Sequence, residues 1–117
     1  MRVSARKINS VLEKELFRIF YQLIADLKTP QEAQKVLESF FGKTESLTFT
    51  KRLGVIYWLS KNRTVTNIRE NLAVSSATIE TIKHQMEKSE GLKLAIKKVT
   101  ADEWANKWSQ KIKKVIS

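Results

Sequence analysis

Residues 64–86 read TVTNIRENLAVSSATIETIKHQM, which has the spacing of two short helices joined by a tight turn. Ile68 and Leu72 lie four residues apart on one face of the first helix, and the second helix repeats this spacing. Ser75 suits the N-cap of the second helix, because its hydroxyl accepts from backbone amides that have no partner in the first turn. The pattern predicts a helix-turn-helix, whose second helix can lie in the major groove of DNA. The alternative is a helical hairpin used only for packing.

Helical spacing continues outside this segment and predicts an all-α chain. Apolar residues recur every three or four positions, and the chain holds only 1 Pro and 3 Gly. Ser10 with Glu13, and Thr29 before Pro30, have the spacing of helix starts. The helices expected outside the motif cover residues 10–27, 30–41, 44–60 and 92–99, and a last helix begins at a capping box of Thr100 and Glu103.

The first of these helices carries an apolar stripe that is broader than one neighbouring helix would cover. Its members are Leu12, Leu16, Ile19, Phe20, Leu23, Ile24 and Leu27, with Val11, Phe17 and Tyr21 beside them. In a domain this small, the surplus indicates a subunit interface as readily as a core.

The charge of the 117-residue chain favours a polyanionic partner. It has 22 Lys and Arg against 12 Asp and Glu, a net charge of +10. Such an excess supports phosphate contacts and counterion release. Residues 91–117 carry 7 basic and 2 acidic groups, whereas residues 51–90 carry 7 and 4. The motif itself is therefore only mildly basic.

The residues needed for catalysis or metal binding are sparse. There is no Cys, which excludes disulfides and thiolate metal sites, and His84 is the single histidine. The three glycines make no phosphate loop. We expect neither an enzyme nor a bound cofactor or metal.

Charged residues also bear on location. Glu13, Lys14, Glu15 and Arg18 interrupt the apolar core that a signal peptide would need, and no window is apolar enough to cross a membrane. We expect a cytoplasmic, nucleoid-associated protein that does not bind membranes.

Three segments make up the expected domain organisation: a basic arm over residues 1–9, a helix-turn-helix domain over residues 10–99, and a basic amphipathic helix over residues 100–117. In the last helix, apolar residues share one face: Trp104, Trp108, Ile112, Val115 and Ile116. Such a helix can pack on the domain or its dimer mate, or bind DNA backbone, a membrane surface or a partner groove.

The motif and its surroundings resemble the Trp repressor superfamily, most closely the small Trp-repressor-like bacterial regulators that lack the tryptophan response. The residues that carry the resemblance are Thr48-Phe49-Thr50-Lys51-Arg52-Leu53, the apolar helix through Leu59, Ile68, Leu72, Val74, Ser75, Ala77-Thr78-Ile79 and Gly91. The resemblance implies an interlocked two-fold dimer that exchanges its N-terminal helices. Its two reading heads would be spaced for successive major grooves.

The second helix of the motif departs from that pattern. Tryptophan-responsive members have Arg-Gly where this chain has Thr81-Ile82. Thr81 offers no cation to a carboxylate and Ile82 would fill the space, so tryptophan is not expected as corepressor, and the effector is unknown. The closest regulators have Ser-Arg where this chain has Glu80-Thr81. A carboxylate there weakens phosphate attraction, although Glu can accept from cytosine.

The function predicted from these features is a dimeric, sequence-specific, DNA-binding transcriptional regulator. Base edges or nearby sugars are expected to meet Ser75, Ser76, Ala77, Glu80, Thr81 and His84. Phosphates are expected to meet Thr78, Lys83, Arg69, Lys51 and Arg52. The alternatives are a non-specific architectural DNA-binding protein and a protein-interaction module that uses the C-terminal tryptophans.

Overall fold

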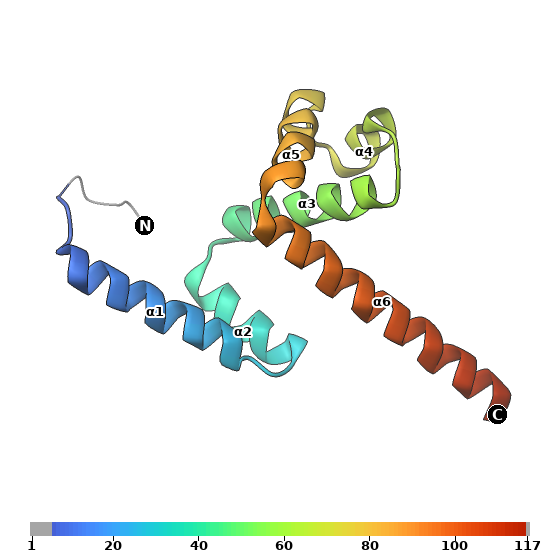
Figure 1. The fold of residues 1–117 in the computed structure, drawn as a ribbon, viewed down its shortest axis with the longest axis horizontal. Coiled ribbons are helices and arrows are strands. Elements are labelled where there is room, and N and C mark those ends of the chain that lie inside the picture. Colours follow the sequence, from blue (N-terminus) through green and yellow to red (C-terminus); the bar gives the residue numbers. More distant parts are fainter. Residues whose placement is uncertain (1–5, 117) are drawn as a thin grey trace. The chain divides into compact units, whose positions relative to one another are not determined.

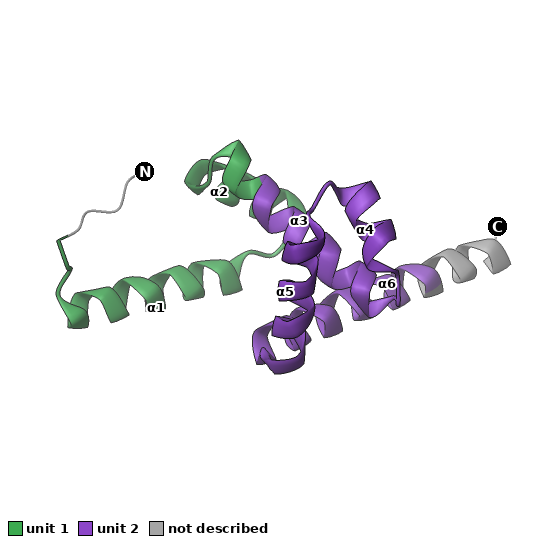
Figure 2. Ribbon diagram, turned by 90° about the horizontal axis from the view of Figure 1, so that it is seen from above, with its two compact units in different colours: residues 1–46 green, residues 47–117 purple. Residues whose placement is uncertain are grey.

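The computed structural model describes the backbone of residues 6–116 and the side chains of residues 6–107, and every regular element in it is a helix. The helices are α1 (Ser10–Asp26), α2 (Pro30–Phe40), α3 (Lys43–Ser60), α4 (Val65–Leu72), α5 (Ser76–Lys88) and α6 (Glu90–Ile116) (Figure 1). The all-α prediction is confirmed. The chain forms two compact units, residues 1–46 and 47–117, coloured separately in Figure 2.

Both helices of the first unit begin at a capping side chain. Thr29 caps α2 as predicted, since its Oγ1 accepts from the Glu32 N–H at 3.1 Å. The predicted cap of α1 is wrong by one residue. Asn9, rather than Ser10, fills this role, because its Oδ1 accepts from two N–H groups of the first turn at 2.9 and 3.3 Å. Ser10 is already the first helical residue.

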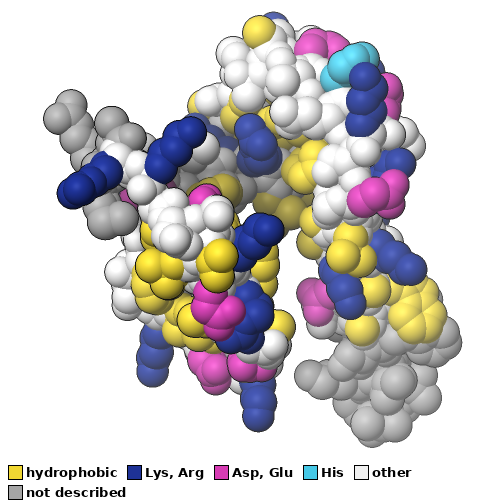
Figure 3. All heavy atoms as spheres, turned by 60° about the vertical axis from the view of Figure 1, so that its left-hand side comes forward, with side chains coloured by type: hydrophobic (Ala, Val, Ile, Leu, Met, Phe, Trp, Pro, Cys, Tyr) yellow, Lys and Arg dark blue, Asp and Glu magenta, His cyan; other side chains and the backbone are white. Residues whose placement is uncertain are grey.

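Helix α1 leaves its apolar stripe exposed. None of its side chains is buried, and Val11 and Tyr21 are 75% and 63% exposed. The other large apolar side chains exposed on this helix are Leu12, Leu16, Phe17, Ile19 and Ile24. Hydrophobic side chains are accordingly visible on the molecular surface in Figure 3. None of the described helices has the length and apolar content needed to span a membrane.

The core of the second unit is a cluster of aliphatic side chains from α3, α4 and α5. The buried members are Val55, Ile56, Ile68, Ile79 and Ile82. Helix α4 packs against α5, and α5 packs against α6, whose Leu92 and Ile96 lie partly buried on the cluster. Gly54 permits the close approach of α3 to α4, because a Cβ there would lie 3.1 Å from Leu72 Cδ1.

The turn between α4 and α5 is compact and uses one strained residue. Ala73 ends α4 in the left-handed conformation, with φ 52° and ψ 49°, and its N–H donates to the Arg69 carbonyl at 3.1 Å. Lys51 Nζ of α3 donates to the Ala73 carbonyl at 3.4 Å. Ser75 caps α5 as predicted, accepting from the Thr78 N–H at 3.2 Å.

The two helices expected over residues 92–99 and from Thr100 onward are one helix, α6, so that prediction is wrong. Ser89 takes the capping role, because its Oγ accepts from the Leu92 N–H at 3.1 Å and starts the helix before Gly91. Thr100 is then an interior helical residue. The side chains of Trp108 and the residues after it, like the basic arm before Arg6, lie outside the described part of the chain.

Glu103 fastens α6 to the end of α3. Its carboxylate lies 2.9 Å from Lys61 Nζ and 3.5 Å from Lys107 Nζ, and it accepts a hydrogen bond from Tyr57. These partners, led by the hydrogen bond from Lys61, lower the pKa of Glu103 to about 2. The same carboxylate raises the pKa of Lys61 and of the Tyr57 hydroxyl.

Replacing Ala73 with Gly is expected to stabilise the protein by about 0.5–1 kcal/mol. A left-handed residue with a Cβ costs about 1–2 kcal/mol, and part of the gain is offset by the greater freedom of Gly in the unfolded chain. Urea unfolding at one protein concentration measures the change. The matched control is Ala101→Gly in α6, which is expected to destabilise by up to about 1 kcal/mol. A loss of stability in Ala73→Gly would contradict the left-handed turn.

The contact of Glu103 predicts an acid-sensitive attachment of α6. Because the folded-state pKa lies below the ordinary value of 4.5, the stabilisation is complete above pH 4.5 and is lost as pH falls toward 2. The melting temperature of the wild type should therefore be higher than that of Glu103→Gln at pH 6. The difference between the two melting temperatures should become smaller below pH 4.5. A gap that stays constant down to pH 2.5, measured by circular dichroism, would show that the carboxylate is not paired.

Candidate nucleic-acid interface

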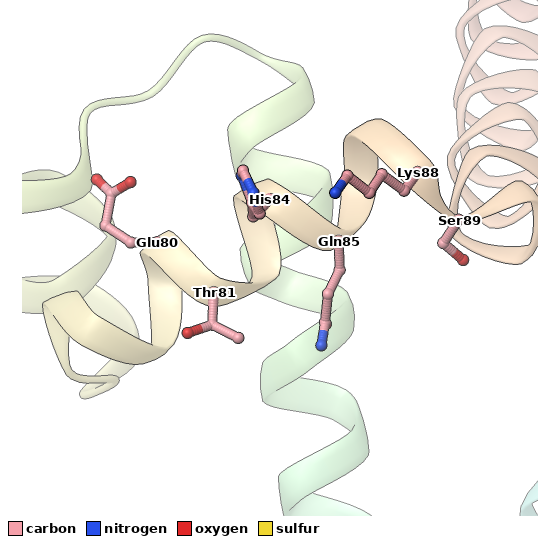
Figure 4. A pocket seen from close by; sticks show the side chains of 6 residues that line it. All are labelled: Glu80, Thr81, His84, Gln85, Lys88 and Ser89. Carbon is pink, nitrogen blue, oxygen red and sulfur yellow. The ribbon is translucent and has the colours of Figure 1, made fainter.

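The outer face of α5 lies opposite its buried isoleucines and is open to solvent. Its exposed side chains are Ala77, Glu80, Thr81, His84 and Lys88. In Figure 4, Glu80 and His84 project along one edge of this face, and Thr81 and Gln85 project along its other edge. These side chains, with Lys88 and Ser89, line an open hollow along the helix. The face is thus long enough for a ligand to contact more than one turn of α5.

Hydrogen bonds within α5 use some of the polar groups predicted to contact DNA. The Ser75 hydroxyl accepts from the Thr78 N–H and donates to Thr78 Oγ1 at 2.9 Å. Thr81 Oγ1 donates to the Ala77 carbonyl at 3.0 Å. The hydroxyl protons of Ser75 and Thr81 therefore have partners inside the chain, and both oxygens meet an incoming ligand as acceptors.

Charges of both signs lie on this face. Glu80 adds a carboxylate one helical turn before His84, and Lys83 is exposed beside them. His84 Nδ1 lies 4.0 Å from the Glu87 carboxylate, a contact that becomes an ion pair when the imidazole is protonated. The outer face therefore offers both donors and acceptors and is not a uniformly basic surface.

Arg69 and Ser76 are brought together across the turn. The guanidinium Nη1 of Arg69, on α4, donates to Ser76 Oγ, on α5, at 3.0 Å. Arg69 is exposed and Ser76 is half-buried. Two residues predicted to contact DNA separately therefore form one unit.

The remaining predicted contacts lie on the α3 side of α5. Lys51, Arg52 and Thr78 line a hollow between α3, the turn and α5. Lys51 is half-buried and is held by the Ala73 carbonyl, whereas Arg52 is exposed. Ile82 lines the same hollow and is only 2% exposed, so its side chain fills part of the space between the helices.

Gln85 and Lys88 are two residues of the outer face that sequence reasoning missed. Both line the hollow in Figure 4. A signal for them was present, since Lys88 follows His84 by four residues and Gln85 follows Thr81 by four. Within the described residues, no group of His, Asp or Glu side chains gathers closely enough to hold a metal ion.

Comparison with known proteins shows the family to which the chain belongs. A family model described as Trp repressor protein matches residues 15–100, which include α2 to α5 entire, most of α1 and the first part of α6. Comparisons with curated proteins and with solved structures gave no match. The matched region covers most of the chain, and the chain therefore belongs to the Trp repressor family.

Proposed function

We propose that the protein is a sequence-specific DNA-binding transcriptional regulator that acts as a dimer. The carrying observation is the exposed outer face of α5, held opposite the buried Ile79 and Ile82 in a chain of the Trp repressor family. In this proposal α4 and α5 are a helix-turn-helix, and α5 enters the major groove. Its setting would be the cytoplasm, on the nucleoid.

The outer face of α5 supplies the base contacts in this proposal. Ala77 can touch a thymine methyl group, and the Glu80 carboxylate can accept from the amino group of cytosine. The other side chains assigned to base edges or nearby sugars are Ser75, Ser76, Thr81 and His84. Thr81 can only accept there, because its proton is bonded to the Ala77 carbonyl.

Phosphate contacts flank this face. Arg52 and Lys83 are exposed cations, and Lys51 and Thr78 line the hollow next to the turn. Contacts of this kind position the protein on the duplex without reading its sequence. Lys51 Nζ donates to the Ala73 carbonyl at 3.4 Å, and this contact directs its ammonium group toward the turn.

Dimerisation is supported by the exposed stripe of α1. A run of large apolar side chains on one helix is more than a monomer normally leaves in water. A second copy that covers this helix is the arrangement implied by an interlocked two-fold dimer. Two reading heads related by a two-fold axis would recognise half-sites about one helical turn apart.

We also propose that tryptophan is not the corepressor. Thr81 has no positive charge for a carboxylate, and the buried Ile82 occupies space beside the turn. A different small molecule in the hollow between α3, the turn and α5 is compatible with the proposal.

A second candidate function is non-specific architectural binding through the basic C-terminal segment. The observation in its favour is charge, since residues 91–117 carry 7 basic and 2 acidic groups. Such binding would depend on phosphates and salt rather than on the sequence of the DNA.

Selection of bound sequences from a random DNA pool, at near-physiological salt, distinguishes these functions. We expect a motif with two-fold symmetry. Ala77→Glu should lower affinity for that motif by about 10- to 100-fold, because a carboxylate replaces a base contact. Ala101→Glu, on exposed α6, is the matched control and should change affinity far less. A wild-type pool without enrichment would refute sequence reading and favour the architectural function.

Light scattering with size-exclusion chromatography tests the dimer. Wild type should have twice the 13.5 kDa mass of the chain. Leu16→Lys with Ile19→Lys should yield monomers, since two charges would be buried in the interface. The control Lys14→Ala changes an exposed side chain of the same helix and should stay dimeric. A monomeric wild type at micromolar concentration would contradict the proposal.

A further inference from the structure

The hydrogen bond between Arg69 and Ser76 connects the end of α4 to the first residue of α5. The side chain of Arg69 donates to Ser76 Oγ at 3.0 Å, and its backbone carbonyl accepts from the Ala73 N–H at 3.1 Å. Arg69 therefore contacts both the residue that begins the turn, Ala73, and the first residue of α5, Ser76. Neither Arg69 nor Ser76 is buried, so the pair is accessible to a ligand at the start of α5.

The chemistry of the two groups fixes the direction of this bond. A guanidinium has five N–H donors and no acceptor, so the Ser76 oxygen must accept. A serine hydroxyl has one proton and two lone pairs, and the bond to Arg69 occupies a lone pair rather than the proton. The nearby positive charge also makes the oxygen a poorer acceptor for a second donor. The hydroxyl proton of Ser76 is therefore available for donation to an acceptor atom of a ligand.

We propose that Arg69 is a positioning residue for DNA reading, which acts by fixing Ser76 as a hydrogen-bond donor to a base edge. This role rests on the proposed function of α5 and replaces the phosphate contact expected of Arg69 from the sequence. The base that faces Ser76 then presents an acceptor in the major groove. Guanine, adenine N7 and thymine O4 satisfy this condition, whereas the amino group of cytosine does not.

The pair contrasts with Glu80, one helical turn further along α5. Its carboxylate can only accept when ionised, so it selects a donor such as the cytosine amino group. Donor and acceptor positions on the same helix would require different bases at neighbouring positions of one half-site. The Arg69 and Ser76 pair supplies the donor part of this recognition.

Selection from a random DNA pool with four proteins tests the inference: wild type, Ser76→Ala, Arg69→Met and the double variant. Ser76→Ala should reduce discrimination at one base pair of the half-site by about 5- to 100-fold. Arg69→Met, which has similar length but no donor, should reduce discrimination at the same base pair. The double variant should show no further loss there, because both changes remove one interaction.

Arg69→Lys is the conservative control, since an ammonium group can still donate to Ser76, and it should retain the base preference. Circular dichroism and thermal melting check that each variant is folded, and Ser76→Ala tests the same base pair without altering Arg69. A uniform loss of affinity across all sequences in Arg69→Met would overturn the inference and restore a phosphate contact. Additive effects in the double variant would overturn it as well. Failure of wild type to select any motif would instead refute the proposed function.

Discussion

The packing of α4 against α5 through buried isoleucines sets the geometry of the second unit. Ile68 of α4 and Ile79 of α5 are completely buried, and Ile82 is nearly so. Full burial of each such side chain contributes roughly 1.5–3 kcal/mol, and a fixed inner face leaves only one orientation for the outer face. The exposure of Glu80 and His84 is therefore a consequence of where Ile79 and Ile82 lie. The same packing requires a sharp turn between α4 and α5, and Ala73 forms this turn by adopting a left-handed backbone conformation.

Much of this arrangement could be predicted from the sequence, because it depends on short intervals. The spacing of Ile68 and Leu72, and the caps Thr29 and Ser75, led to correct helices. The errors arose where a side chain has the spacing of a cap but does not act as one. Asn9 precedes Ser10 and accepts from the first amides of α1. Thr100 and Glu103 have the spacing of a capping box, but α6 begins after Ser89 and continues through Thr100 without a break. Local patterns identify possible caps, but only the assembled helix decides which one is used.

The candidate site was less predictable, because its decisive contacts join residues far apart in the sequence. Helical periodicity alone places Glu80, Thr81 and His84 on one surface. It does not show that Lys51 reaches the Ala73 carbonyl, 22 residues away, or that Arg69 donates to Ser76, 7 residues away. Both bonds depend on the conformation of the turn, which no spacing rule specifies. The sequence alone therefore does not show that Lys51 and Arg69 bind oxygens within the chain.

The internal contacts of the cations also change how the net charge of +10 should be interpreted. Lys61 is paired with the Glu103 carboxylate and so contributes little field of its own. Lys51 and Arg69 bind neutral oxygens, which leaves their charge intact while restricting their motion. A charged side chain that is already ordered loses less conformational entropy when it meets a ligand. In the proposed complex, Lys51 can therefore meet a phosphate at a lower entropic cost, while Arg69 adds positive charge beside the turn and keeps its hydrogen bond to Ser76. The proposed DNA binding by this mildly basic motif would therefore depend on a few positioned cations and not on a densely positive surface.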